Sequence, residues 1–405
     1  MPAATAAPAQ TARFTWPLTR LDVAGAFGDM GVLFPIAIAL ITLNHMNPTA
    51  VFLAAGLTYC IAARYFGIAI AVQPFKAVAA IALALSLSPA TIASAGLLMG
   101  VLLLFVGVTN LAGWLAKLFT LPIVRGIQLG LGLLLIREGL RLVLGTKAAL
   151  AVGGVTVAPW VIALGGAALL VAFRASRRFP AALVLLAAGI AGGVAFHRGH
   201  LAALGWGPVP LELLHPKLAE LERVLPLLVV PQFALTFGNS IVATENTAQL
   251  LYGEQARRVT VRALSLAIGM VNLASAAIQG SPLCHGSGGI TAHYRFGARS
   301  PKSSYVIGGV CMLLALFGRA AVGLLELIPV AVLGVFLVYV GVQHAAYLRD
   351  LRKRWPQFLI AVAVGAVSLL TTNLMWGFLV GFVLEGSLWI FTRLRSKEQG
   401  LGIGG

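Results

Sequence analysis

Long apolar runs with few interruptions dominate the pattern of hydrophobic and polar positions along the chain. The runs near residues 51–69, 92–112, 157–173, 181–196, 306–317, 330–342 and 358–370 are nearly free of charge. Several approach the roughly 20 residues that an α-helix needs to cross the hydrocarbon core of a bilayer. The apolar positions do not alternate, and glycine and alanine are frequent, which favours helices over a β-barrel. The pattern therefore predicts an all-α polytopic membrane protein.

Two short interruptions lie at corresponding places in the two halves. The first is Gln73-Pro74-Phe75-Lys76 and the second is the glycine-rich segment 282–289, and each precedes a short helical stretch. We count fourteen transmembrane segments, in which the third and the tenth are half-helices preceded by short extended stretches. Such a pair of broken helices is the best sequence pointer to a secondary transporter's substrate site near the bilayer midplane. The free N–H groups at both half-helix starts would favour an anion there.

The spacing of landmarks indicates a weak internal repeat. Gly28 and Pro74 are 46 positions apart, and Gly238 and Pro282 are 44 apart. An odd number of spans in each half turns the second copy upside down, which predicts seven-plus-seven inverted repeats. The expected organisation is a disordered cytoplasmic tail at 1–18, a first repeat at 19–200, a connecting segment at 201–223, a second repeat at 224–395 and a cytoplasmic tail at 396–405.

Composition and charge support a membrane protein and argue against a nucleic-acid-binding protein. The chain of 405 residues is 59% hydrophobic and only 10% charged, against about a quarter charged in soluble domains. The net charge of +17 does not indicate nucleic-acid binding, because the basic residues occupy loops between spans. Placing both termini in the cytoplasm puts twenty Lys and Arg residues on that side and seven on the other, which follows the positive-inside rule. We therefore expect a multi-pass protein of the plasma (inner) membrane, with lipid as its surroundings.

A few ionisable residues fall within the predicted spans, where they are costly and usually functional. Lys76 occupies the first turn after Gln73-Pro74, where a cation opposes the helix dipole unless an anion or an acid compensates it. Lys76 is therefore a candidate anion ligand, and the alternatives are a side chain that extends to the cytoplasm or a pair with Asp29. Arg125, at the start of another span, fits a structural ion pair as well as a ligand role.

The second interruption combines glycine with polar donors in the sequence Cys284-His285-Gly286-Ser287-Gly288. Exposed backbone N–H groups in such a segment form an anion-binding concavity, although the glycines would also permit tight packing. No further ligands cluster with Cys284, His285 and His293, so we expect no metal site. We also expect no cofactor and no enzymatic activity, because no nucleophile–base pair or cofactor motif is present.

The eighth predicted span adds small polar groups at Thr236, Asn239, Ser240 and Thr244, most of them on one helical face. Glu245 follows immediately and is the best candidate for proton coupling in this half. Asp29 is its rival in the first half.

Several of these segments together resemble the molybdate transporters related to sulfate permeases. The resemblance rests on segments 27–31, 72–77, 122–130, 236–240 and 284–299, and it covers essentially the whole membrane region. Phe75 stands where the family pattern has methionine. The resemblance implies the inverted-repeat fold shared with sulfate and uracil permeases, in which the third and tenth segments face a substrate between a core and a gate. It also implies the absence of a cytoplasmic STAS domain, and a homodimer as the assembly common among relatives.

The function implied by the resemblance is high-affinity, proton-coupled uptake of a tetrahedral oxyanion, molybdate first and sulfate second. The candidate substrate-binding residues are Gln73, Phe75, Lys76, Asn239, Ser240, Cys284, His285, Gly286, Ser287 and Gly288. A nucleobase permease is an alternative of the same class. An anion channel and a non-transporting membrane scaffold are alternatives of other classes.

Overall fold

The computed structural model describes residues 18–109, 111, 115, 120–145, 150–152, 155–173, 176, 181–196 and 205–400. The expected tail at 1–18 lies outside these ranges except for Leu18. The first half contains, in order, α1 (Arg20–Ala26), α2 (Met30–Leu43), α3 (Pro48–Phe66), β1 (Gln73–Pro74), α4 (Lys76–Leu85), α5 (Pro89–Thr109), α7 (Leu121–Gly145), β2 (Leu150–Val152), β3 (Val155–Val157), α8 (Pro159–Phe173) and α9 (Ala181–Phe196).

The second half begins with one long helical segment that two π-helical turns interrupt. It consists of α10 (Leu218–Val224), the π-helical turn η2 (Leu225–Val229), α11 (Val230–Leu235), the π-helical turn η3 (Thr236–Val242), α12 (Ala243–Tyr252) and the 3₁₀ turn η4 (Gly253–Ala256). The chain continues through α13 (Val261–Ala277), β4 (Leu283–Cys284), α14 (Ser287–Arg295), α15 (Lys302–Leu316), α16 (Gly318–Glu326), α17 (Val330–Ala345), the 3₁₀ turn η5 (Ala346–Leu351), α18 (Trp355–Thr371) and α19 (Leu374–Gly400).

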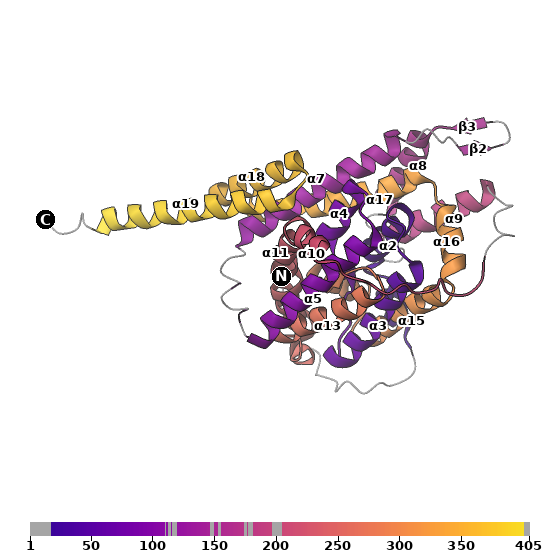
Figure 1. Ribbon diagram of the computed structural model, residues 1–405, viewed down its shortest axis with the longest axis horizontal. Coiled ribbons are helices and arrows are strands. Elements are labelled where there is room, and N and C mark those ends of the chain that lie inside the picture. The colour runs from indigo at the N-terminus through magenta and orange to yellow at the C-terminus, as the bar shows by residue number, and fades with distance from the viewer. Residues whose placement is uncertain are drawn as a thin grey trace.

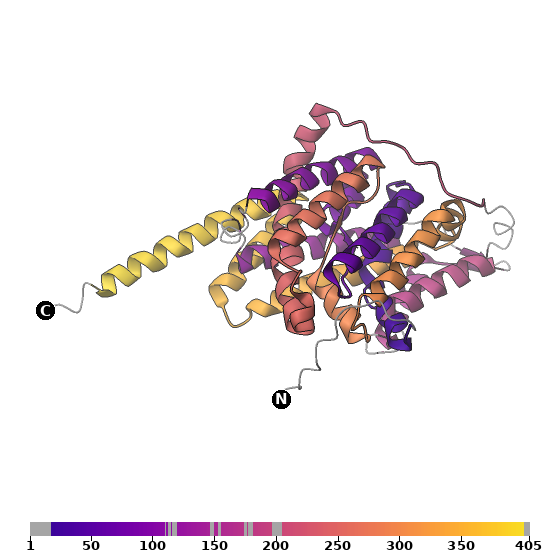
Figure 2. The same cartoon turned by 90° about the horizontal axis from the view of Figure 1, so that it is seen from below.

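Helices from the two halves pack against one another in pairs. The pairs are α3 with α15, α5 with α13 and α7 with α17. Figure 1 shows α3, α5, α13 and α15 on one side of the molecule, α7, α17 and α18 on the other, and α2 and α4 between them. Figure 2, from below, shows α19 extending away from the remaining helices. The short elements that carry the candidate residues therefore lie between two groups of longer helices.

Glycine allows α7 and α17 to approach closely. A Cβ atom added to Gly132 would lie 2.5 Å from the carbonyl oxygen of Gly341, and one added to Gly341 would lie 2.6 Å from that of Gly132. Added Cβ atoms at Gly126 and Gly130 would each lie 2.5 Å from a side chain of α18. Glycines 126, 130 and 132 thus permit tight packing of α7 against α17 and α18, and such contacts hold helices together in lipid.

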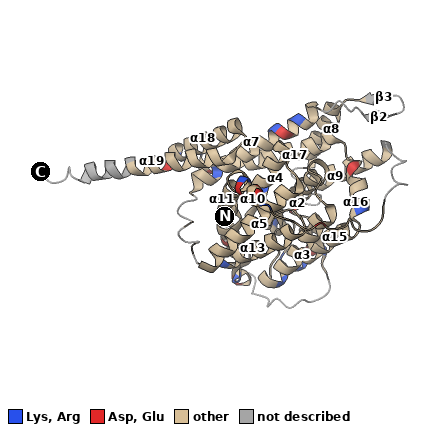
Figure 3. Ribbon diagram, in the orientation of Figure 1, with Lys and Arg blue, Asp and Glu red and all other residues tan. Residues whose placement is uncertain are grey.

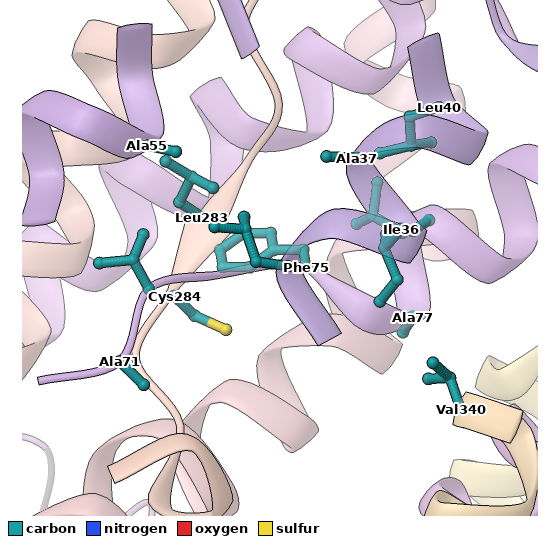
Figure 4. Close-up of a cluster of buried hydrophobic side chains, with 14 of the residues drawn as sticks. Ile36, Ala37, Leu40, Ala55, Ala71, Phe75, Ala77, Leu283, Cys284 and Val340 are labelled. Carbon is teal, nitrogen blue, oxygen red and sulfur yellow. The ribbon is translucent and has the colours of Figure 1, made fainter. Parts of the chain in front are cut away.

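The two interrupted segments meet at a short antiparallel pairing of β1 with β4, in which Gln73 faces Cys284 and Pro74 faces Leu283. The N–H group of Phe75 also donates to the carbonyl oxygen of Pro282 at 2.8 Å. Figure 4 shows Phe75, Leu283 and Ile36 in the buried apolar cluster around this crossing. The crossing fixes the starts of α4 and α14, because each helix begins within three residues of its strand.

The helices have the character of membrane spans. Four helical segments of the described chain are long and apolar enough to cross a bilayer: Pro48–Phe66, Pro89–Thr109, Leu218–Ala256 and Val330–Leu351. Two bent pairs, α1 with α2 at 42° and α15 with α16 at 89°, raise that number to six. Figure 3 shows long stretches of helix without a charged residue. The protein is thus a multi-pass helical membrane protein, while the count of fourteen segments and the domain boundaries stay predictions.

Candidate functional site

A cavity of about 300 Å³ lies where the two interrupted segments meet the end of α17. It holds the volume of about ten water molecules, which is enough for a five-atom oxyanion with part of its hydration. Its lining comes from the break between α1 and α2 with the start of α2, from β1, α4, η3 and α14, from the end of α8 and the start of α9, and from the end of α17 with η5. The cavity therefore lies between the elements that sequence reasoning singled out and a wall that it did not.

Three polar side chains from the first half form a hydrogen-bonded row along the cavity. Lys76 Nζ donates to Gln73 Oε1 at 2.6 Å. Gln73 Nε2 in turn donates to both carboxylate oxygens of Asp29, at 2.7 and 2.6 Å. All three residues line the cavity, and each is at most 9% exposed. Lys76 is therefore linked to Asp29 through Gln73, and its ammonium group lies at the cavity wall.

The N-terminus of α14 is open towards the same space. Its capping residue, Gly286, has no side chain to accept a hydrogen bond, and the N–H groups of Ser287, Gly288 and Gly289 find no acceptor among the described residues. Gly288 and Gly289 line the cavity. Unpaired N–H groups and the dipole at a helix start favour negative charge.

Asp29 lies close to the same helix end. A Cβ atom added to Gly289 would lie 2.5 Å from Asp29 Oδ2, so only glycine lets the carboxylate approach this closely. The site therefore contains one buried cation, one buried carboxylate and one open helix N-terminus.

The start of α4 differs from the sequence expectation. Gln232 on α11 places its Oε1 atom 2.9 Å from the Ala77 N–H and 3.3 Å from the Val78 N–H, and accepts both. The prediction that both helix starts offer free N–H groups is therefore wrong for these two residues of α4. Gln232 satisfies donors that an apolar surrounding would otherwise leave unpaired. The anion-binding potential of backbone groups lies mainly on α14.

Asn239, Ser240 and Cys284 gather at a second, smaller cavity of about 10 Å³, which Lys76 and His344 also line. Asn239 lines both cavities and accepts a hydrogen bond from Ser287 Oγ at 3.1 Å. Asn239 and Ser240 belong to the π-helical turn η3, and such local changes of winding are frequent at functional sites.

Other predicted residues point elsewhere. Phe75 is buried in the apolar cluster of Figure 4. His285 donates through Nδ1 to the carbonyl oxygen of Ala71 at 2.8 Å and packs edge-on against Phe66. Glu245 is partly exposed on α12 and is not among the residues that line the larger cavity. Gly286 contacts Gln73: a Cβ atom there would lie 2.5 Å from Gln73 Oε1.

Sequence reasoning missed the wall formed by α17 and η5. Tyr339, Gln343, His344 and Tyr347 all line the cavity. A usable signal was present, because positions 339, 343 and 347 recur every four residues and so share one face of a helix. Tyr339 lies within the apolar run 330–342, and Gln343, His344 and Tyr347 follow it.

Arg125 forms an ion pair rather than lining the cavity. Its Nη2 atom lies 2.6 Å from Asp350 Oδ2, and its Nη1 atom donates to Gln128 Oε1 at 2.9 Å. This geometry supports the structural alternative for Arg125.

Among the described residues, no group of three or more His, Cys, Asp or Glu side chains could hold a metal ion.

Comparison with known proteins places this arrangement in a family. The family model described as "Molybdate transporter of MFS superfamily" matches residues 22–135 and 225–343, which is more than half of the chain. The chain is also 27% identical to Molybdate transporter 2 of Arabidopsis thaliana over 93% of its own length and 88% of that protein's length.

Solved structures show the same fold at low sequence identity. The overall structure of SLC26A9 matches with a TM-score of 0.68 and 16% identity, over 92% of this chain and 65% of that one. The transmembrane domain of a cyanobacterium bicarbonate transporter, BicA, matches with a TM-score of 0.66 and 18% identity, over 89% of this chain and 97% of that one.

Proposed function

Because this chain belongs to the molybdate transporter family, we propose that it is a secondary active transporter that imports a tetrahedral oxyanion, molybdate, across the plasma membrane. The proposed binding site is the cavity between Lys76 and the N-terminus of α14. Relatives named as molybdate transporters, one of them 27% identical over 93% of the chain, support this choice of substrate.

The observation that carries the proposal is the convergence of Lys76 Nζ and the unpaired N–H groups of α14 on one cavity. A helix N-terminus contributes about half a positive charge, and Lys76 contributes one more. The side-chain amide of Asn239, which also lines the cavity, adds a neutral donor. This arrangement fits an oxyanion better than a neutral nucleobase, which would need paired donors and acceptors.

Alternating access is the mechanism that we propose, and the way the cavity is built supports it. One wall comes from residues 28–32 at the α1–α2 break, β1, α4, η3 and α14, which belong to the proposed core. The other comes from α8, α9, α17 and η5 of the proposed gate, which also includes α7, α18 and α19. The pairing of α3 with α15 and of α5 with α13 is what two inverted seven-segment repeats would produce, with α4 and α14 as their half-helices. Rocking of core against gate around a fixed site is the usual transport motion of such repeats.

Asp29 is the proposed proton-coupling residue, in preference to Glu245. With Asp29 ionised, its charge cancels that of Lys76, and only the helix end attracts a dianion. Protonation of Asp29 restores the full charge of Lys76. Proton binding and anion binding therefore support each other, which is the reciprocity that coupled transport needs.

Sulfate is the second candidate substrate, because it has the same shape and charge and the cavity holds either ion. A channel or a non-transporting scaffold could have the same fold, but neither would couple anion uptake to a proton gradient.

Calorimetric titration of the purified protein with molybdate, tungstate, sulfate and uracil tests the substrate class. We expect saturable binding of molybdate and none of uracil, and the reverse would overturn the proposal. Uptake into proteoliposomes that a protonophore abolishes distinguishes a coupled transporter from a channel.

A further inference from the structure

The cavity wall opposite α14 carries a hydroxyl group with no assigned role. A Cβ atom added to Gly288 would lie 3.1 Å from Tyr347 Oη, so the hydroxyl reaches the first turn of α14. Tyr347 Oη makes no hydrogen bond to any described residue, although Tyr347 lines the cavity. A hydroxyl group without a protein partner, beside N–H groups without acceptors, is available to a bound ligand.

Arg125 and His344 both pack against the ring of Tyr347. The Arg125 guanidinium lies over it, 5.1 Å from the ring centroid, and Asp350 fixes Arg125 through their 2.6 Å ion pair. His344 packs edge-on against the same ring, with 6.2 Å between centroids. A planar guanidinium restrained by a carboxylate is well suited to orienting an aromatic ring.

We propose that Tyr347 is an anion-binding residue whose hydroxyl donates to the oxyanion seated at the N-terminus of α14, and that Arg125 with Asp350 positions it. The assignment rests on the proposed function. The hydroxyl comes from η5, on the gate side, whereas the N–H groups come from α14 in the core. An anion bound between them contacts both walls, so its presence favours their approach.

The phenol-to-phenyl change tests the role of the hydroxyl. In Tyr347→Phe, molybdate binding to the purified protein should weaken about tenfold, as expected for loss of one hydrogen bond to a charged acceptor. The ligand-free thermal midpoint should stay unchanged, because the hydroxyl has no protein partner. Tyr65→Phe makes the same change at an exposed position outside the cavity and should bind like the unaltered protein.

Unaltered molybdate affinity in Tyr347→Phe, with binding intact in the parent protein, would overturn this assignment and leave the proposed function standing. A parent protein that binds neither molybdate nor sulfate would overturn both.

The positioning role has its own test. Arg125→Lys keeps the charge but loses the planar face, so it should weaken molybdate binding about threefold in the parent protein. In the Tyr347→Phe background it should have no further effect, because its action passes through the lost hydroxyl. An equal loss in both backgrounds would show that Arg125 acts on the anion independently of Tyr347.

Discussion

Lys76 shows how the charge of a buried residue is compensated by its neighbours. The residue is only 9% exposed, and an isolated charge there would be costly. Gln73 supplies an acceptor at 2.6 Å and passes the interaction on to Asp29. The lysine is thus compensated without a direct ion pair, and its remaining donors stay available to an anion.

Replacing Lys76 by glutamine should therefore reduce anion affinity. We expect the Kd for molybdate to rise at least about tenfold, because a charge-assisted contact is lost, while the protein still reaches the membrane. Titration calorimetry measures the change. Lys353→Gln, at an exposed position, is the matched control, and equal affinity in both variants would remove Lys76 from the site.

Gly286 provides a second test at this scale, because it keeps Gln73 in place. Gly286→Ala puts a methyl group 2.5 Å from Gln73 Oε1, so the side chain must leave Lys76 or Asp29. Molybdate affinity should fall about fivefold or more as the hydrogen-bonded row is disrupted. An alanine at Gly309, where a Cβ atom meets nothing within 4 Å, should leave affinity unchanged. Normal binding in Gly286→Ala would mean that the row does not shape the site.

At the scale of elements, α4 depends on a residue far away in sequence. Gln232 caps the Ala77 and Val78 N–H groups across 155 and 154 positions. Its Nε2 atom donates to Thr236 Oγ1 at 2.9 Å, which fixes the orientation of the amide. The interrupted helix of one half is therefore completed by a helix of the other.

Gln232→Leu should destabilise the protein, because it leaves two buried N–H groups without an acceptor, at about 1–3 kcal/mol each. A lowered thermal midpoint in detergent measures this. Gln232→Glu keeps an acceptor oxygen at a helix N-terminus, where negative charge is favourable, and should lose less. Equal midpoints for the leucine variant and the parent would contradict the capping role.

The starts of α4 and α14 could be predicted because their signals are local. Proline at position 74 and glycine at positions 286, 288 and 289 interrupt apolar runs in the sequence itself. The cap from Gln232 could not be predicted, since a lone glutamine in an apolar run does not reveal its partner. Phe75 and His285 lie next to the right residues in sequence, but their side chains pack into the apolar interior around Phe66 and Leu283.

At the scale of the whole molecule, the site is assembled from both halves and from two groups of helices. Core residues were predictable because ionisable and glycine-rich positions stand out in apolar sequence. Tyr347 and Gln343 did not stand out, because they follow the apolar run 330–342, and polar residues are ordinary after such a run. Their place at the cavity is set by the packing of α17 against α7, which no single segment encodes.

Proton-driven transport is a property of the whole molecule, because it links a proton on one residue to the movement of the helices. Asp29→Asn imitates a permanently protonated carboxyl group, so molybdate should bind several-fold tighter and with little dependence on pH. Proton-driven accumulation in proteoliposomes should be lost, while molybdate exchange at equilibrium persists. Glu245→Gln, away from the cavity, should retain proton-driven accumulation. Loss of coupling in Glu245→Gln with normal coupling in Asp29→Asn would reverse the assignment.

The most direct measurement is the anomalous scattering of molybdenum in crystals of the protein grown with molybdate. We expect one dominant peak in the cavity, within hydrogen-bonding reach of Lys76 Nζ and the N–H groups of Ser287, Gly288 or Gly289. A dominant peak elsewhere, or no peak at saturating molybdate, would show that the anion does not bind at this site.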